Sequence, residues 1–374
     1  MTDGIHGKKG RFDLCAFCPD LCLDRCPVVA STGSVTYSPF AKMLHGWLIE
    51  NGRIPASEEV AELFYQCTGC LSCHEACAHD VDVETSLFDL RAELVDKGIA
   101  PYGQDIFEVP TQDLIQAQSA VIPKRYFVPE ARAVLFPGCH ALLDRPGLVK
   151  DVLAVFRHLN IEFIGASDEA AMCCGYPLHA GGYRDAFLER AEEVSSALRR
   201  YRMVVTLSPC CEHTMKNLFA AAGVSRPPVV TSALDIVAPL VMRTEREPLG
   251  LRLSYHDSCF LGRHMGQYDL PREVITHVNG LSPIEMRMNR GDAACCGAGG
   301  GWDRTSPVLS GIAASSVIQM ADDAGADVVV SASSTCASHL DSRGDGPAKV
   351  MDLFSLIAAW LKPKRSKPKR RRRR

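Results

Sequence analysis

The feature that most constrains this chain is the spacing of its cysteines. Of its 374 residues 17 are cysteine, and eight of them form two short runs. The first run, C-x2-C-x3-C-x3-C-P, holds Cys15, Cys18, Cys22 and Cys26, and the second, C-x2-C-x2-C-x3-C, holds Cys67, Cys70, Cys73 and Cys77. A loop with this spacing wraps an iron–sulfur cube and offers three thiolates from one side. The runs therefore predict two [4Fe-4S] clusters.

The expected ligand sets are crossed, because the fourth cysteine of such a run normally reaches the other cluster. One cluster is expected to take Cys15, Cys18, Cys22 and Cys77, and the other Cys67, Cys70, Cys73 and Cys26. An extra residue inside the first run and Ala78 in place of the usual proline remove no ligand. The alternative is a pair of structural zinc sites, which usually pair two C-x2-C knuckles instead.

The termini and the hydropathy pattern favour a cytoplasmic protein. The chain begins MTDGIHGKKGRFDLC, with no apolar stretch before a cleavage site, and no transmembrane segment is expected because no apolar run reaches about 18 residues. Cytosolic thiols stay reduced, so clustered cysteines there indicate metal binding rather than disulfides.

The length predicts more than one domain. Residues 1–97 carry both dense cysteine runs, and we expect an α+β or α-rich ferredoxin-type module with helices over about 39–50, 57–65 and 84–97. Residues 98–131 contain four prolines and are predicted to be a linker. From Ala133 onward short apolar runs alternate with helical patterns, which is typical of an α/β fold.

The α/β part repeats once. LRLSYHDSC corresponds to AVLFPGC, and DVVVSASSTC corresponds to MVVTLSPCC, with cysteine offsets of 120, 122 and 125 residues. We therefore expect two duplicated α/β domains, 132–245 and 246–361, the second closed by a helix over 350–361. A disordered basic tail, 362–374, is expected to follow.

The basic tail changes the charge balance of the chain. It holds 10 cations and leaves the body with 31 cations against 44 acids. No aromatic residue lies between its cations, so no specific binding of nucleic acid is expected.

Each repeat places cysteines at or just after the carboxyl ends of its predicted strands, where ligands gather in open α/β sheets. The candidate metal ligands are Cys139, Cys173, Cys174 and Cys211 in the first repeat and Cys259, Cys295, Cys296 and Cys336 in the second.

These pieces resemble a known family. PGCH, CCGYPLHAGGYRDAF, YHDSCFLGR, CCGAGGG and the final STC are similar to the cysteine-rich CCG domains of the B-type and D-type heterodisulfide reductase subunits, the glycolate oxidase iron–sulfur subunit and the C-type subunit of anaerobic glycerol-3-phosphate dehydrogenase. The resemblance covers nearly all of the chain except the tail. It implies electron transfer from a flavoprotein dehydrogenase subunit to a quinone, haem or disulfide acceptor, with a membrane-anchored partner at the inner face of the membrane.

One departure from the family bears on the CCG repeats. The family motif ends in C-x-x-C, which gives five cysteines for a noncubane cluster, whereas Ser208 and Ser333 stand at the first of those positions here. With four thiols per repeat, and Cys210 counted as extra, we expect one further [4Fe-4S] cluster or one zinc in each CCG domain. The alternative is that these are reduced core cysteines without a metal.

The primary hypothesis is an iron–sulfur electron-transfer subunit of a flavin-linked dehydrogenase or heterodisulfide-reductase-like complex. No catalytic residue is predicted in the chain itself, and the GAGGG at 297–301 lacks the G-x-G-x-x-G spacing of a dinucleotide loop. Two alternatives stay open. One is a catalytic disulfide reductase acting at a CCG-domain cluster, and the other is an iron–sulfur sensor with a nucleic-acid-binding tail.

Overall fold

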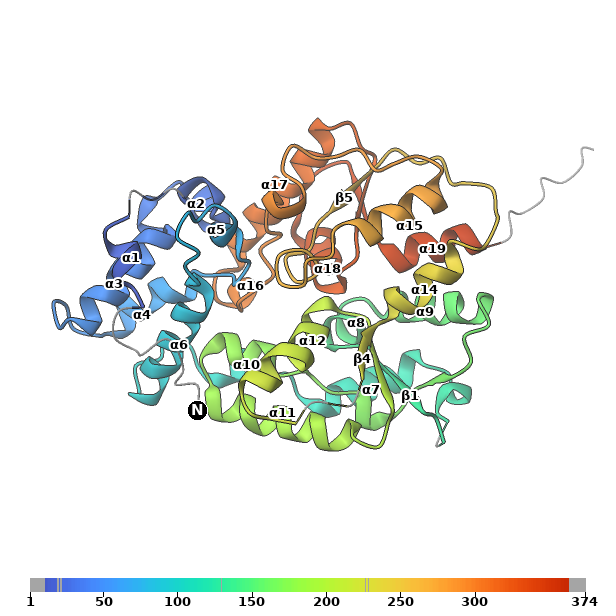
Figure 1. The fold of residues 1–374 in the computed structure, drawn as a ribbon, viewed down its shortest axis with the longest axis horizontal. Helices are drawn as coiled ribbons and strands as arrows, with labels where there is room; N and C mark the ends of the chain where they lie inside the picture. Colours follow the sequence, from blue (N-terminus) through green and yellow to red (C-terminus); the bar gives the residue numbers. More distant parts are fainter. Residues whose placement is uncertain are drawn as a thin grey trace, which may run out of the picture.

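The computed structural model describes residues 11–18, 20, 22–128, 130–225, 227 and 229–362, so the predicted tail lies outside the described residues from 363 onward. Three bodies pack side by side (Figure 1). The helical N-terminal module, in blue, lies against two α/β units, the first in green and yellow and the second in orange and red.

The N-terminal module is built from helices, and among its described residues there is no strand. Its helices are α1 (Asp13–Ala16), α2 (Pro27–Thr32), α3 (Pro39–Glu50), α4 (Glu58–Tyr65), α5 (Ser72–Glu75) and α6 (Val83–Asp96), with 3-10 turns at Leu23–Arg25 and Val35–Tyr37. Ser38, Ser57 and Asp82 cap α3, α4 and α6 by accepting hydrogen bonds from backbone N–H groups three residues ahead. Apolar faces of these helices pack around Phe12 and Phe64, which are fully buried.

The segment 98–131, predicted to be a linker, contains the helix α7 (Thr111–Val121) between 3-10 turns at Gln104–Ile106 and Lys124–Tyr126. Its prolines lie outside the helix, since Pro110 is the N-cap and Pro123 follows the end. Leu114 on α7 is fully buried in the core of the first α/β unit. The segment is therefore packed structure as well as a connection.

The first α/β unit has a four-stranded parallel sheet in the order β2-β1-β3-β4. The strands are β1 (Ala133–Phe136), β2 (Ile164–Gly165), β3 (Met203–Thr206) and β4 (Val230–Ser232). Its helices are α8 (Cys139–Leu143), α9 (Pro146–His158), α10 (Tyr176–Gly181), α11 (Arg184–Leu198), α12 (Pro209–His213), α13 (Phe219–Ala221) and α14 (Ala233–Val241), with a 3-10 turn at Asp168–Ala170 and a π-helical turn at Thr214–Leu218. The short strands are buried and carry β-branched residues, as parallel strands covered on both faces do.

The second α/β unit has a parallel sheet in the order β5-β6-β7, and a single bridge from Ser254 to Ile284 lies where β2 pairs in the first unit. The strands are β5 (Leu253–His256), β6 (Val328–Ser331) and β7 (Lys349–Asp352). The helices are α15 (Asp269–Asn279), α16 (Trp302–Thr305), α17 (Pro307–Asp323), α18 (Ser334–Arg343) and α19 (Leu353–Leu361), with a 3-10 turn at Arg290–Asp292.

The helix predicted over 350–361 is wrong at its start. Lys349–Asp352 pairs with β6 as a strand, and α19 begins at Leu353. The carboxylate of Asp352 caps the helix by accepting a hydrogen bond from the N–H of Phe354 at 2.8 Å. A short apolar run fits a buried strand and a buried helix equally well, and only the neighbouring strand decides between them.

Arg91 joins all three bodies. This α6 residue is fully buried. Its guanidinium donates hydrogen bonds to the carbonyl oxygens of Phe64 and Cys67 in its own module, of Ala180 in the first α/β unit and of Gly300 in the second. One planar cation therefore satisfies carbonyl groups from three separate parts of the chain.

Candidate iron–sulfur sites

Two cavities in the N-terminal module are lined by the cysteines of the two runs. We call the first the outer cavity; its cysteines are Cys15, Cys18, Cys22 and Cys77, with Cys73 at its border. We call the second the inner cavity; its cysteines are Cys26, Cys67, Cys70 and Cys73. Each cavity thus contains the four cysteines of one expected crossed set. Ligation by these sets stays a prediction.

The thiols of the outer cavity are crowded and partly withdrawn from water. Burial and the neighbouring Cys77 raise the pKa of Cys15 to about 12, and burial together with Asp20 raises the pKa of Cys22 to about 12. Thiolates in such a place need a nearby positive charge, which the irons of a cluster supply. In the inner cavity, Leu71 between Cys70 and Cys73 has φ +58°, a left-handed conformation that non-glycine residues seldom adopt.

A third cavity lies between the two α/β units, and we call it the shared cavity. Cysteines of both repeats line it: Cys139, Cys174, Cys210 and Cys211 from the first, and Cys259, Cys295, Cys296 and Cys336 from the second. Its volume is about 760 Å³, part of it open to solvent. The sequence led us to expect one site in each repeat, whereas the structure turns the carboxyl edges of the two sheets toward one common space.

Five thiols of the first repeat are in mutual contact. Hydrogen bonding with Cys173, Cys210 and Cys211 lowers the pKa of Cys174, and hydrogen bonding with Cys173 lowers the pKa of Cys139 to about 7. Cys210 was left out of the sequence-based ligand set because the family motif places the additional ligand at Ser208. The adjacent pair Cys210-Cys211 at the start of α12 was the signal that could have revealed it.

The second repeat has four thiols of its own and one contact from outside. Cys295 accepts hydrogen bonds from Cys259, Cys296 and Cys70, which lower its pKa. Cys70 belongs to the inner cavity, so the inner and shared cavities meet at this sulfur–sulfur contact.

The remaining thiol of the second repeat, Cys336, lies at the start of α18. Hydrogen bonding with Cys296, His256 and Ser333 lowers its pKa. The N–H of Cys336 donates to the hydroxyl oxygen of Ser333 at 3.4 Å. Ser333 therefore caps α18 at the position where the family motif has a cysteine.

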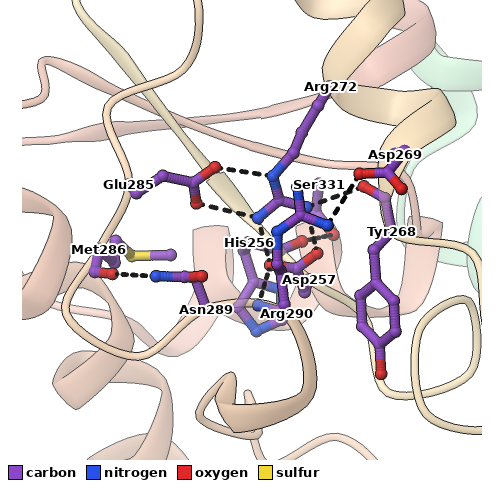
Figure 2. A network of polar contacts seen from close by, with 10 residues as sticks. All are labelled: His256, Asp257, Tyr268, Asp269, Arg272, Glu285, Met286, Asn289, Arg290 and Ser331. Atoms are coloured by element: carbon purple, nitrogen blue, oxygen red, sulfur yellow. Dashed lines mark hydrogen bonds and ion pairs between the residues drawn. The ribbon is translucent and has the colours of Figure 1, made fainter.

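An ion-pair network holds the segment that leads to Cys259 (Figure 2). Arg272 on α15 makes a two-pronged pair with Asp257, at 2.7 and 2.8 Å, and another with Glu285, at 2.7 and 2.9 Å. Asp257 also accepts a hydrogen bond from the N–H of Arg290 at 2.7 Å. Because Asp257 directly follows β5 and precedes Cys259 by two residues, the network fixes this edge of the shared cavity.

The GAGGG loop at 297–301 packs closely against the N-terminal module. A Cβ atom added at Gly299 or Gly300 would collide with the backbone of Thr68 or Cys67 in the inner-cavity loop. At its start, the N–H of Gly297 donates to the sulfur of Cys295 at 3.4 Å. The glycines thus let the second α/β unit approach the N-terminal module at backbone distance.

The cysteine thiols that line the three cavities fit iron–sulfur clusters as ligands. All 17 cysteines are free thiols, and a Cβ added at Gly138 would lie 3.0 Å from the sulfur of Cys211, so the backbone there leaves room for the thiol. Among the described residues no three Cys, His, Asp or Glu side chains converge to hold a single metal ion. A cluster spreads its thiolates over several irons and does not need such convergence.

The helical two-cavity module and the thiol-rich edges of two parallel sheets define an iron–sulfur protein of the electron-transfer class. Residues 133–216 and 253–341 match the cysteine-rich CCG domain, and residues 11–81 match the 4Fe-4S dicluster domain. The chain belongs to the family of CCG-domain iron–sulfur proteins, which confirms the family predicted from the sequence.

Two relatives support this assignment, and one solved structure shares the fold. The D-type subunit of dihydromethanophenazine:CoB--CoM heterodisulfide reductase from Methanosarcina acetivorans is 27% identical over 93% of this chain and 94% of that protein. The B-type subunit of fumarate reductase (CoM/CoB) from Methanothermobacter marburgensis is 24% identical over 90% of this chain and 70% of that protein. The crystal structure of a hypothetical protein from Helicobacter pylori aligns with a TM-score of 0.56 at 10% identity, over 88% of this chain and 68% of that one, and shows a shared fold alone.

Within the described part of the chain, every helix is too short or too polar to cross a bilayer.

Proposed function

We propose that this chain is the electron-transfer subunit of an oxidoreductase complex and passes single electrons from a flavoprotein partner toward the shared cavity. The observation that carries the proposal is the continuity of the three thiol-lined cavities. Cys73 lines both the outer and the inner cavity, and Cys70 of the inner cavity contacts Cys295 of the shared one. Bound clusters supply the one-electron chemistry, and the cysteines would hold them in a continuous row.

The proposed ligand sets follow the cavities. Cys15, Cys18, Cys22 and Cys77 would hold one [4Fe-4S] cluster in the outer cavity, and Cys26, Cys67, Cys70 and Cys73 would hold another in the inner cavity. Cys259, Cys295, Cys296 and Cys336 would hold a third group. The order β5-β6-β7 corresponds to β1-β3-β4 of the first sheet, which supports an origin of the two α/β units by duplication.

The partners are proposed by analogy with the relatives, which are subunits of a heterodisulfide reductase and of a fumarate reductase. A flavoprotein subunit would deliver electrons to this chain. A quinone- or haem-linked subunit would receive them where the complex is attached to a membrane.

The test of the proposal is the iron content and electron uptake of the full chain. After anaerobic reconstitution we expect at least about eight irons per chain, with interacting paramagnetic centres on reduction. The isolated chain should accept electrons from dithionite or a reduced flavoprotein and should oxidise no hydroxy acid. Retention of zinc without iron, or turnover of such a substrate by the chain alone, would contradict the proposal.

A second candidate function is reduction of a disulfide at the shared cavity, where two electrons and two protons convert a disulfide into two thiols. Two observations favour it: both repeats face one common space, and the first repeat has five thiols in contact. The four-thiol count had argued against a noncubane cluster, and Cys210 removes that argument for the first repeat.

The role of Cys210 can be tested by comparing two variants of the same loop. If Cys210 is a ligand, Cys210→Ala should lower the iron content assigned to the α/β units and change their EPR spectrum. Ser208→Ala, which removes a hydroxyl two residues away, should change neither. Equal iron content and equal spectra in the two variants would show that Cys210 is not a ligand. Loss of disulfide reduction in Cys210→Ala alone would favour the second function.

A further inference from the structure

A buried lysine lies beside the thiols of the inner cavity. Lys42 on α3 is 1% exposed, and its ammonium donates a hydrogen bond to the sulfur of Cys26 at 3.9 Å. The cap of α3 by Ser38 fixes the first turn of the helix, from which Lys42 projects into the cavity. Its position in the cavity is thus set by the helix itself.

Lys42 has no carboxylate within ion-pair distance among the described residues. A buried ammonium is costly unless an anion compensates it. The anions within reach are the thiolates of Cys26, Cys67 and Cys73. Cys26 accepts the hydrogen bond of Lys42, and the charge of Lys42 also acts on Cys67 and Cys73. The residue is therefore placed to neutralise a negatively charged group in this cavity.

The outer cavity has the opposite charge. Asp20 lines it and accepts a hydrogen bond from the thiol of Cys22 at 3.6 Å. No lysine or arginine is present among the described residues that line the outer cavity, where His79 is the other titratable group besides the thiols. One carboxyl group, Glu84, lines the inner cavity, and burial raises its pKa to about 8, so that it is largely uncharged near neutral pH. Two further cations lie at the inner cavity, where Arg91 donates to the carbonyl oxygen of Cys67 and Arg263 to that of Cys70.

This contrast in charge affects the reduction potentials of the two cluster sites. Adding one electron adds one negative charge, which a nearby cation favours and a nearby carboxylate opposes. The outer cysteines are more exposed than Cys26 and Cys70, and exposure raises the potential of the outer site. A unit charge in direct contact with an inner thiol outweighs this effect because water does not screen it.

We propose that Lys42 raises the reduction potential of the inner site above that of the outer site and so directs electrons inward. This inference rests on the proposed function. One electron is lost at the outer site and gained at the inner site, after a reduced flavoprotein has supplied it. From the inner site it leaves through the Cys70–Cys295 contact toward the acceptor at the shared cavity.

The test is a potentiometric titration followed by EPR on the full, anaerobically reconstituted chain. In Lys42→Met, which keeps all but the last atom of the side chain's length and removes its charge, we expect the ratio of reduced to oxidised inner site at fixed potential to fall about tenfold. For a one-electron couple this is a shift of about 59 mV. The outer site should be unchanged.

Two further variants complete the design. Lys97→Met removes an exposed cation of the same module and should shift neither site. Asp20→Asn removes the outer carboxylate and should shift the reduction potential of the outer site upward. A purely structural role of Asp20 would not predict a shift in that direction.

An unchanged inner potential in Lys42→Met, or an equal shift in Lys97→Met, would overturn the proposal. If Lys42→Met loses the inner irons, the titration is made on Lys42→Gln, and loss of iron there too would assign Lys42 to cluster assembly instead. Failure of the proposed function looks different, because the unmodified chain would then retain no iron or take up no electrons.

Discussion

Replacing Arg91 by methionine is expected to lower the free energy of unfolding by about 3–5 kcal/mol. The methionine can fill much of the space between Tyr65 and Phe88, over whose rings the guanidinium lies at 4.8 and 4.5 Å. It cannot donate the hydrogen bonds that now satisfy four buried carbonyl groups. Relief of the buried charge offsets part of this loss, and the unpaired carbonyl groups remain.

The effect should be concentrated at the junction of the three bodies. We therefore expect Arg91→Met to increase cleavage by proteases between the N-terminal module and the α/β units. The variant should also lower the denaturation midpoint of the reconstituted chain. The matched control is Arg184→Met on α11. Arg184 also spans from the first α/β unit to α6, through Asp89 and Asp96, but it is 39% exposed.

Surface ion pairs contribute about 0–1 kcal/mol, so the control should be close to the unmodified protein. Equal stability losses in the two arginine variants would mean that the carbonyl groups around Arg91 find other donors, and the role assigned to Arg91 would then be wrong.

The second large effect is expected from the crossed cysteines. Cys26 ends the first run in sequence, yet it lines the inner cavity with three cysteines of the second run. Removing its thiolate by Cys26→Ala should cost the inner site its fourth ligand, and about four irons per chain should be lost. The outer site should keep its EPR signal.

The reciprocal variant serves as the control. Cys77→Ala, in the second run, should remove the outer signal and leave the inner one, because Cys77 lines the outer cavity. Iron analysis and EPR of both full-length variants, prepared anaerobically, make the comparison. If each variant disturbed only the cluster of its own run, the crossed assignment would be refuted while the presence of two clusters would stand.

Much of the local structure could be predicted because its signals are local. The helices over 39–50, 57–65 and 84–97 correspond to α3, α4 and α6 within one or two residues, since caps and apolar spacing lie within each segment. The helix α7 and the strand β7 were missed for the opposite reason. The helix α7 is mostly polar and β7 has only four residues, so the state of each depends on the neighbours that it packs against.

The sequence by itself indicated iron–sulfur chemistry in the N-terminal module, because cysteine spacing within a loop decides which three sulfurs can face one cluster. It also predicted the family and the electron-transfer role, which the comparisons confirm. Only the tertiary structure decided which cavities adjoin. The turning of two sheet edges into one cavity, the contact of Cys70 with Cys295 and the approach of Lys42 to Cys26 join residues far apart in the chain. Such contacts depend on how whole elements pack, and no local sequence pattern encodes them.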